Sequence, residues 1–421
     1  MSAPFAESPG PSRPRRRQSL LLGLIALLLL VDGALLGALA SRRLARAPAG
    51  AAAPHGVDWT RLSPTDLRVA AAFGALQREG LGASLDVLEH AAAEDSAVLR
   101  DGHQLAHALG RQAVAARGGD ASVISECRPS FASGCYHGVV EGSLKARGHL
   151  DMGVLKRMCA AAGSDERPGP VYECVHGLGH GVLGAVGFDL GAALHYCDAL
   201  GSGFDAWCHS GVFMEAITSS LGEPSRDAAA APGSSHAGMA HAGMDRAEHA
   251  SLAHQLSLDP ADPYSPCDRF EDPYGAACWR YQGFVILRDH AFDPAEALRT
   301  CDEAPRGRAG SCYESIGHQL TGLFQRGDAW VIEQCARGSP DLAPHCAAGA
   351  ALALAQMDWS GASAARFCEA SPPQWKSACY RTTAGLLTAV ASRAQRTKLC
   401  SQIESDYVKP CRRAAALDGG S

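Results

Sequence analysis

The sequence predicts an all-α fold, a right-handed α-solenoid of about nine helical hairpins of about 34 residues each. Two observations support this prediction. Sixteen cysteines recur with a fixed period, and alternating runs of Val, Ile, Thr or Tyr that would indicate strands are sparse. The 421 residues are 47% hydrophobic and 19% charged, which is typical of a globular protein with a sizeable core.

The cysteines fall into eight pairs, and in six of them the partners lie eleven residues apart. The first cysteines of successive pairs are separated by 32 to 38 residues, except for one interval of 70 that holds an insertion. A fixed period of this size indicates a repeat architecture in which each hairpin needs its neighbours. The pairs are Cys127 and Cys135, Cys159 and Cys174, Cys197 and Cys208, Cys267 and Cys278, Cys301 and Cys312, Cys335 and Cys346, Cys368 and Cys379, and Cys400 and Cys411.

Helix-start signals precede the first cysteine of several pairs. The clearest is Asp293-Pro294 followed by Glu296, which combines an N-cap, a proline at the first helical position and a capping-box glutamate. Each repeat is therefore predicted to consist of helix A ending at the first cysteine, a loop, and helix B beginning at the second. His90 and Asp101 occupy the two cysteine positions of an earlier hairpin, so nine repeats run from about residue 80 to 416.

We expect disulfides within the repeats, each joining the end of helix A to the start of helix B. Closing so short a loop contributes about 2–3 kcal/mol in the chain-entropy model. Pairing between repeats is the alternative that spacing leaves open. The chain contains no CxxC, which argues against zinc ribbons, thioredoxin-type redox sites and haem attachment.

The N-terminus predicts export. A basic segment, 1–18, precedes an apolar segment, 19–41, that is long enough to span a bilayer, with the basic segment cytoplasmic. A signal peptide cleaved after Ala38-Leu39-Ala40 is the alternative. Both an anchor and a signal peptide predict that the rest of the chain is periplasmic or extracellular. Residues 1–46 carry a charge of +5 and the whole chain carries −6, so the rest of the chain carries −11. This acidic composition excludes the basic surface with which proteins bind nucleic acids.

The period and hairpin design resemble the tetratricopeptide-like α-solenoid superfamily, especially its cysteine-rich, disulfide-stapled secreted members. The resemblance covers about 80% of the chain, from about residue 80 to about 416. Within this stretch the repeats occupy 80–222 and 263–416, after a linker and leading helix at 42–79. The aromatic consensus motif of true tetratricopeptides is absent. The resemblance implies architecture and, as an alternative function, a non-catalytic protein-interaction scaffold of the cell envelope that binds a protein or peptide on its concave face.

The predicted B helices carry histidines and glutamates two and six residues after the second cysteine, or after its equivalent position. Residues at i and i+4 share a helix face, and equivalent helices of neighbouring repeats lie about 8–10 Å apart. These side chains are therefore expected to converge on a transition metal, with iron, copper or zinc as candidates. The candidate ligands are His103 and His107, His137 and Glu141, His176 and His180 and, if the superhelix curls far enough, Glu314 and His318.

This layout is analogous to deoxyhypusine hydroxylase, where His-Glu motifs on successive helical repeats hold two irons. The directly adjacent His-Glu dipeptides of that enzyme do not occur here. The predicted function is a membrane-anchored extracytoplasmic helical-repeat protein that binds a transition metal, either a metal-dependent oxidase or hydroxylase or a metal-handling protein. The alternative is structural: the histidines fill polar gaps, and Gly138, Gly177, Gly179 and Gly181 mark close helix packing.

An insertion at 223–262 separates the two sets of repeats and is rich in histidine and methionine. Imidazole and thioether favour copper in oxidising compartments, and the segment resembles the Met/His-rich loops of exported copper-resistance proteins. A flexible low-complexity loop is the alternative. The candidate copper ligands are His236, Met239, His241, Met244, His249 and His254.

Overall fold

The computed structural model describes residues 63–201, 203–221, 261–305, 307–324 and 326–418, all within one unit, Leu62–Ser421. The described residues are helical, with no strand among them beyond an isolated bridge between Ser164 and Arg167. The all-α prediction is confirmed.

Nine B helices follow one another along the described part of the chain. They are α4 (Ser96–Ala116), α5 (Gly134–Arg147), α7 (Gly169–Ala185), α9 (Asp205–Leu221), α11 (Tyr274–Asp289), α13 (Ala309–Gln319), α15 (Ala343–Met357), α17 (Pro373–Val390) and α19 (Ser405–Ala414). A π-helical turn, η6 (Leu320–Phe324), extends α13.

Shorter A helices alternate with the B helices, and an additional helix, α2 (Pro64–Glu79), precedes them. The A helices are α3 (Leu81–Glu94), α6 (Met152–Ala161), α8 (Leu190–Asp198), α12 (Pro294–Asp302), α14 (Asp328–Cys335), α16 (Ala362–Ala370) and α18 (Arg393–Gln402). Aspartate side chains at 151, 189 and 293 accept from backbone N–H groups at the starts of α6, α8 and α12, as the cap pattern predicts.

All eight disulfides form within the repeats, with the predicted partners. Cys127 is bonded to Cys135, Cys159 to Cys174, Cys197 to Cys208, Cys267 to Cys278, Cys301 to Cys312, Cys335 to Cys346, Cys368 to Cys379, and Cys400 to Cys411. The alternative of pairing between repeats is therefore not what the structure has.

The prediction that helix B begins at the second cysteine needs a correction. The B helices begin slightly before it, so that Cys135, Cys278, Cys312 and Cys346 lie one to four residues after the first residue of α5, α11, α13 and α15. The helix can start earlier because a cysteine in the first turn or two of helix B still reaches the end of helix A. The Cα atoms of the eight pairs lie 5.2 to 5.6 Å apart.

The prediction of an α-helical helix A is wrong before Cys127 and Cys267. Cys127 follows a 3-10 turn, η2 (Ala121–Glu126), because α4 extends to Ala116 and leaves too little chain for a full helix. Cys267 lies in a 3-10 turn, η5 (Cys267–Arg269), preceded by prolines at 263 and 266 that lack the N–H needed to continue a helix.

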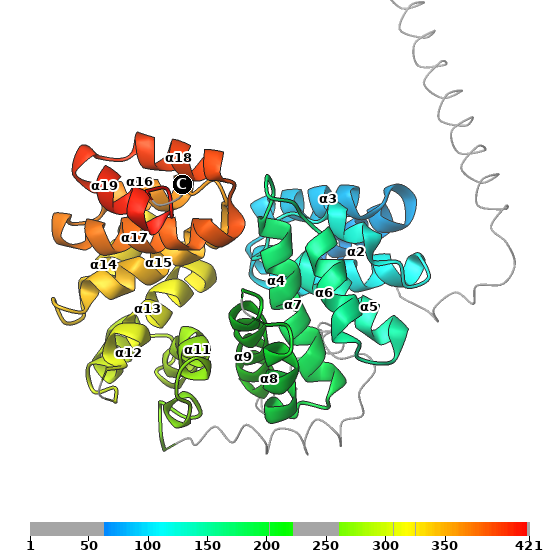
Figure 1. Cartoon of the computed structure of the whole chain (residues 1–421), viewed down its shortest axis with the longest axis horizontal. Helices are drawn as coiled ribbons and strands as arrows, with labels where there is room; N and C mark the ends of the chain where they lie inside the picture. Colours follow the sequence, from blue (N-terminus) through cyan, green and yellow to red (C-terminus); the bar gives the residue numbers. More distant parts are fainter. Residues whose placement is uncertain (1–62, 202, 222–260, 306, 325, 419–421) are drawn as a thin grey trace, which may run out of the picture. The chain divides into compact units, whose positions relative to one another are not determined.

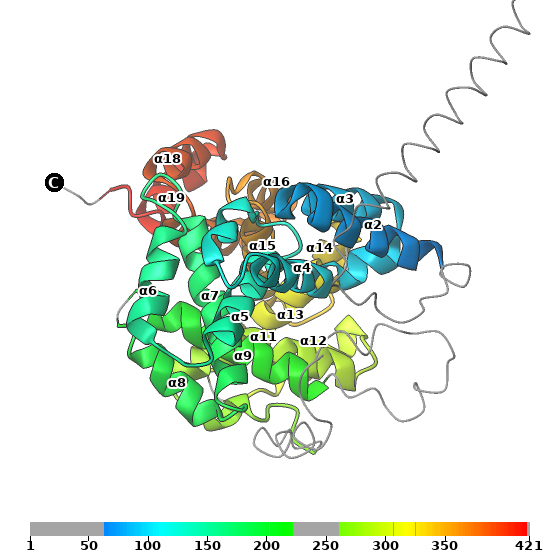
Figure 2. The same ribbon diagram turned by 90° about the vertical axis from the view of Figure 1, so that its right-hand side faces the viewer.

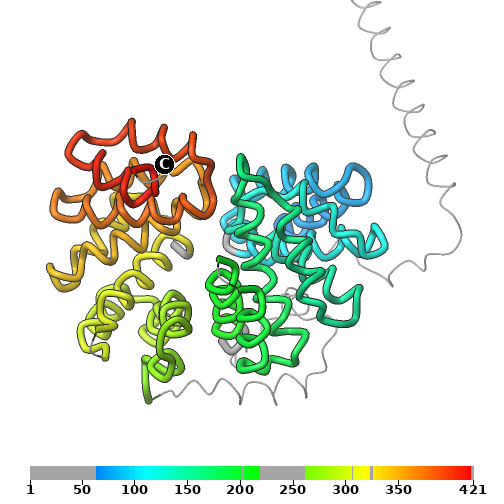
Figure 3. Tube along the Cα trace, viewed as in Figure 1, coloured from blue at the N-terminus to red at the C-terminus, as the bar shows by residue number. Residues whose placement is uncertain are grey.

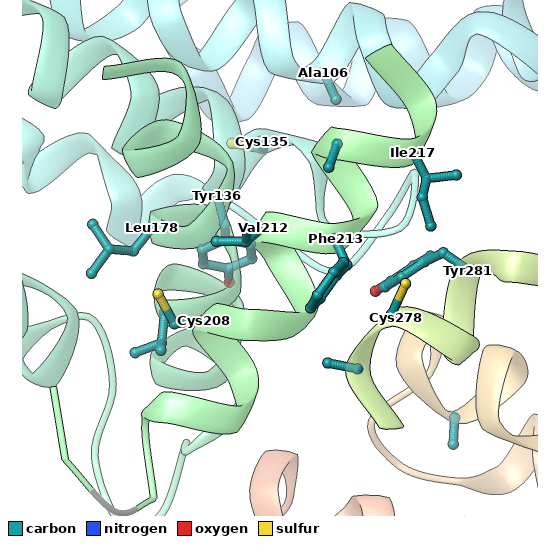
Figure 4. Close-up of a cluster of buried hydrophobic side chains, with 14 of the residues drawn as sticks. Ala106, Cys135, Tyr136, Leu178, Cys208, Val212, Phe213, Ile217, Cys278 and Tyr281 are labelled. Carbon is teal, nitrogen blue, oxygen red and sulfur yellow. The ribbon is translucent and has the colours of Figure 1, made fainter. Parts of the chain in front are cut away.

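Each B helix packs against the next, from α4 through to α19 (Figures 1 and 3). Figure 2 shows α5 beside α4 and α7. Between α9 and α11, Phe213 and Ile217 lie on the side that faces Tyr281 (Figure 4). The row also curves back on itself, because α7 contacts α17 and Gly169 packs against the Trp359 ring. Helices that are far apart in sequence are therefore neighbours at the start of α7.

Glycines allow neighbouring B helices to approach closely. A Cβ atom on Gly138 would overlap the carbonyl oxygen of His107. A Cβ on Gly177 would lie 2.8 Å from the Cα of His137, and one on Gly211 would overlap the carbonyl oxygen of His176. Gly179 likewise meets the backbone of α9, and Gly181 meets the Leu144 side chain. These contacts place the backbones of the histidine-bearing helices side by side.

No helix among the described residues is long and apolar enough to cross a membrane. The predicted anchor at 19–41 lies outside the described residues. The six candidate copper ligands of the insertion lie outside them as well, since residues 222–260 are not described.

Candidate metal centre

Five of the predicted ligands gather at the junction of α4, α5 and α7. They form two groups of three that share His137, and within each group one nitrogen per residue lies within 4.8 Å of the others. All except His103 are buried. The groups are His103, His107 and His137, and His137, His176 and His180.

On α4, the Nδ1 atoms of both histidines carry the hydrogen. His103 Nδ1 lies 2.8 Å from the carbonyl oxygen of Phe131, and His107 Nδ1 lies 2.9 Å from Glu141 Oε1. Carbonyl and ionised carboxylate oxygens only accept, so each Nδ1 must donate and each neutral Nε2 must carry a lone pair. These two Nε2 atoms face each other at 3.1 Å.

The same logic applies to α7. His180 Nδ1 lies 2.9 Å from Glu215 Oε2, so the His180 Nε2 lone pair faces His176 Nε2 at 3.2 Å. An N–H at His176 Nε2 would satisfy this contact, but it would leave His176 Nδ1 as a bare lone pair, and that buried atom has no partner among the described residues.

His137 presents the same problem between the two pairs. Its Nδ1 lies 3.2 Å from His107 Nε2, and a hydrogen there would satisfy His107. The opposite atom, His137 Nε2, is buried without a hydrogen-bond partner in the described part of the chain. Every neutral arrangement therefore leaves buried nitrogen lone pairs uncompensated, which is costly in a protein interior.

Protonation of His103, His137 or His176 does not relieve this conflict at neutral pH. Burial, together with the neighbouring imidazoles, lowers the pKa of His103 to about 3 and holds the pKa values of His137 and His176 well below their ordinary value. A metal ion would relieve it. Two nitrogens about 2.0–2.1 Å from a tetrahedral ion lie about 3.3–3.4 Å apart, close to the separations found here.

Carboxylates accept hydrogen bonds from the Nδ1 atoms of His107 and His180 at the edge of the cluster. Burial would raise the pKa of Glu141, but His107 and Arg111 lower it to about 2, and Arg111 Nη1 lies 2.6 Å from Glu141 Oε2. Glu141 was predicted as a ligand, and the structure places it behind His107. This carboxylate-to-imidazole arrangement fixes the tautomer of a metal-binding histidine.

Glu173, in contrast, is buried, and burial raises its pKa to about 8. One of its carboxyl oxygens lies 3.6 Å from His137 Nε2, beyond hydrogen-bonding distance. This carboxyl group is therefore largely neutral at pH 7 and adds little negative charge to the cluster.

Sequence reasoning missed four of these positions. Glu215 lies seven residues after Cys208, one residue beyond the register that selected the candidate ligands, and Glu173 lies directly before Cys174. Phe131 contributes only a carbonyl oxygen, which is oriented by a turn with φ angles of 54°, 47° and 62° at residues 131–133. Arg111 is the one of the four that the sequence could have indicated, because it lies four residues after His107 and therefore on the same helix face.

The structure places Glu314 and His318 outside both groups. Glu314 Oε1 lies 3.0 Å from His345 Nδ1, and His318 Nε2 lies 2.7 Å from Gln356 Oε1. The curvature of the row does bring His318 towards the histidine cluster, because its partner Gln356 also donates to the Tyr172 hydroxyl at the start of α7.

No family model matches this chain, and no curated protein or solved structure matches it either. The likeness to tetratricopeptide-like proteins stays a prediction.

The metal-free protein is expected to lose stability as the pH falls below about 6.5. The folded-state pKa of His103 is about 3, so the unfolded chain binds more protons between pH 6.5 and 3, and stability falls with pH in this window. His103 alone should lose about 3 kcal/mol by pH 4. Chemical denaturation of metal-free protein at pH 7.5, 6 and 4.5 measures this.

A matched variant, His103→Gln, should flatten that pH dependence, since it removes one titrating group. An unfolding midpoint that does not change from pH 7.5 to 4.5 would contradict the depressed pKa values.

Proposed function

We propose that this protein binds a transition-metal ion through imidazoles on three successive helices. The observation that carries the proposal is the pair of Nε2–Nε2 contacts at 3.1 and 3.2 Å, in a cluster where His137 Nε2 and His176 Nδ1 are buried without a hydrogen-bond partner among the described residues. The proposed ligands are His103, His107, His137, His176 and His180.

The donor set narrows the choice of ion. All cysteines are in disulfides, so no thiolate is available, and the ligand nitrogens are imidazoles with carboxylates behind them. This set suits zinc, copper or iron and disfavours magnesium or calcium, which prefer oxygen. A bound ion would supply Lewis acidity, which serves both a metal-handling protein and a metal-dependent oxidase or hydroxylase.

We also propose the setting in which this site works. The row of B helices with A helices beside it supports an α-solenoid. Eight disulfides support an oxidising compartment, and the apolar segment 19–41 supports a membrane anchor or a leader for export.

Metal analysis of protein produced in an oxidising compartment tests the proposal. We expect at least one equivalent of zinc, copper or iron, and near-complete loss in the variant with His137, His176 and His180 changed to alanine. His209→Ala is the matched control, because His209 is a buried histidine of a B helix, paired with Asp198 and outside both groups.

Metal-free wild-type protein that takes up none of the three ions on reconstitution would refute the proposal. The histidines would then be structural, as an interaction scaffold requires.

A further inference from the structure

A buried carboxyl group, that of Glu173, lies against the histidine cluster. Glu173 is 4% exposed, and one of its carboxyl oxygens lies 3.6 Å from His137 Nε2. Within the described part of the chain no lysine or arginine forms an ion pair with it, whereas Glu141 is paired with Arg111. The protein thus supplies no cation to balance Glu173 when this carboxyl group is ionised, and a buried carboxylate needs one.

Glu173 shares a face of α7 with two of the proposed ligands. It lies three residues before His176 and seven before His180, which places the three side chains on one stripe of the helix. This stripe faces α5, because the ring centroids of His176 and His180 lie 4.9 and 4.7 Å from that of His137. The face of α7 that meets His137 therefore carries a carboxyl group as well as two imidazoles.

The separation between His137 Nε2 and the Glu173 oxygen fits an ion between the two atoms. At 3.6 Å the atoms are too far apart for an N–H···O hydrogen bond, which spans about 2.7–3.2 Å. A nitrogen about 2.0–2.1 Å and a carboxylate oxygen about 2.0–2.2 Å from one ion lie about 3.3–3.6 Å apart at tetrahedral to trigonal angles. His137 Nε2 is also buried without a hydrogen-bond partner among the described residues. Its lone pair is therefore available to such an ion.

The other ring nitrogen of His137 belongs to the α4 side of the cluster. His137 Nδ1 lies 3.2 Å from His107 Nε2, which lies 3.1 Å from His103 Nε2. The lone pairs of the two nitrogens of an imidazole ring point in different directions, so one ion cannot bind both. Since the two groups of three share only His137, this residue can serve each group with one nitrogen.

We propose that the cluster holds two metal ions bridged by the His137 ring, and that Glu173 is a ligand of the second ion. The inference rests on the proposed function, because it adds a second ion to the same histidines. The ligands of the first ion are His103, His107 and His137 Nδ1, and those of the second are His137 Nε2, Glu173, His176 and His180.

Binding of the second ion releases two protons to solvent. His137 loses its remaining ring N–H proton, so that both nitrogens donate lone pairs, and the Glu173 carboxyl group loses its acid proton. The two negative charges that result balance the two positive charges of a divalent ion. Burial raises the pKa of Glu173 in the metal-free protein, and the ion takes the place of the proton that this burial retains.

Equilibrium dialysis of the full chain, metal-free at the start, against cobalt(II) tests the second ion, with metal analysis as the readout. We expect wild type to hold one cobalt more per chain than Glu173→Gln, whose affinity for the second ion should fall by about 100-fold. Glu173→Asp should retain part of that affinity. The insertion at 223–262 is present in every variant and does not affect these differences.

A double variant separates two ions from one ion shared by all the ligands. His103→Ala should remove the first cobalt, Glu173→Gln the second, and the two changes together should remove both. A single shared ion would instead be lost only once, whichever ligands are changed. Glu173→Gln resembles the protonated carboxyl group of the metal-free protein, so circular dichroism should show an unchanged fold.

Glu404→Gln is the matched control, since Glu404 is a partly buried glutamate that binds Lys376 and Tyr380 and lies outside both histidine groups. Equal cobalt contents in wild type and Glu173→Gln, or loss of only one cobalt in the double variant, would overturn the inference and leave metal binding intact. Wild-type protein that takes up neither cobalt nor zinc would overturn the proposed function and the second ion together.

Discussion

Replacing His137 with alanine is expected to abolish metal binding, with a loss of affinity greater than about 100-fold. His137 belongs to both three-histidine groups, so its loss leaves neither group complete. Substituting an outer-shell partner of a ligand already costs about 10- to 100-fold, and removing a shared ligand must cost more. His103→Ala or His176→Ala should cost less, because each leaves one group of three intact.

Competition with a chromophoric chelator measures these affinities, and circular dichroism confirms that each variant is folded. His209→Ala controls for loss of a buried imidazole in a neighbouring B helix. If His103→Ala were as damaging as His137→Ala and His176→Ala had no effect, a single ion at the α4 end would replace the shared arrangement.

The histidine-bearing positions could be predicted because a repeat places equivalent residues in register. Counting from the cysteines put five histidines on one face of three successive helices, and the structure brings them together. The same count could not find Glu215, because it lies on a neighbouring stripe of α9 that reaches His180 only after the helices pack. Nor could it find the Phe131 carbonyl, since any residue type supplies a carbonyl.

The curvature of the row could not be predicted from the period. How far each hairpin turns relative to the previous one depends on contacts between B helices, such as the approach of Gly138 to His107. That turn decides whether Tyr172 meets Gln356. It also explains why His318 approaches the cluster but bonds to Gln356 instead.

Packing glycines and candidate metal-binding histidines are alternative explanations of one motif in the sequence, but in the structure the two roles are compatible. Gly177 follows His176 directly and packs on the backbone of His137. A larger residue there would push α5 and α7 apart and separate His137 from His176. The glycines therefore set the spacing at which the imidazoles meet.

Two disulfides that contribute similarly to the free energy of unfolding are expected to differ in their effect on the proposed metal site. Replacing both cysteines of Cys159–Cys174 or of Cys400–Cys411 by alanine should cost about 3 kcal/mol each in the chain-entropy model, because they close loops of similar length. The sequence separations are 15 and 11 residues. Chemical denaturation measures this loss for each variant.

Only the first pair should also weaken metal binding. Cys174 lies two residues before His176 and ties the first turns of α7 to the end of α6, whereas Cys400–Cys411 joins α18 to α19 at the other end of the row. Loss of the first disulfide frees α7 to shift against α5, and a displacement of the order of 1 Å is enough to spoil a coordination site. Equal metal affinities in the two variants would show that helix packing alone holds His176 and His180 in place.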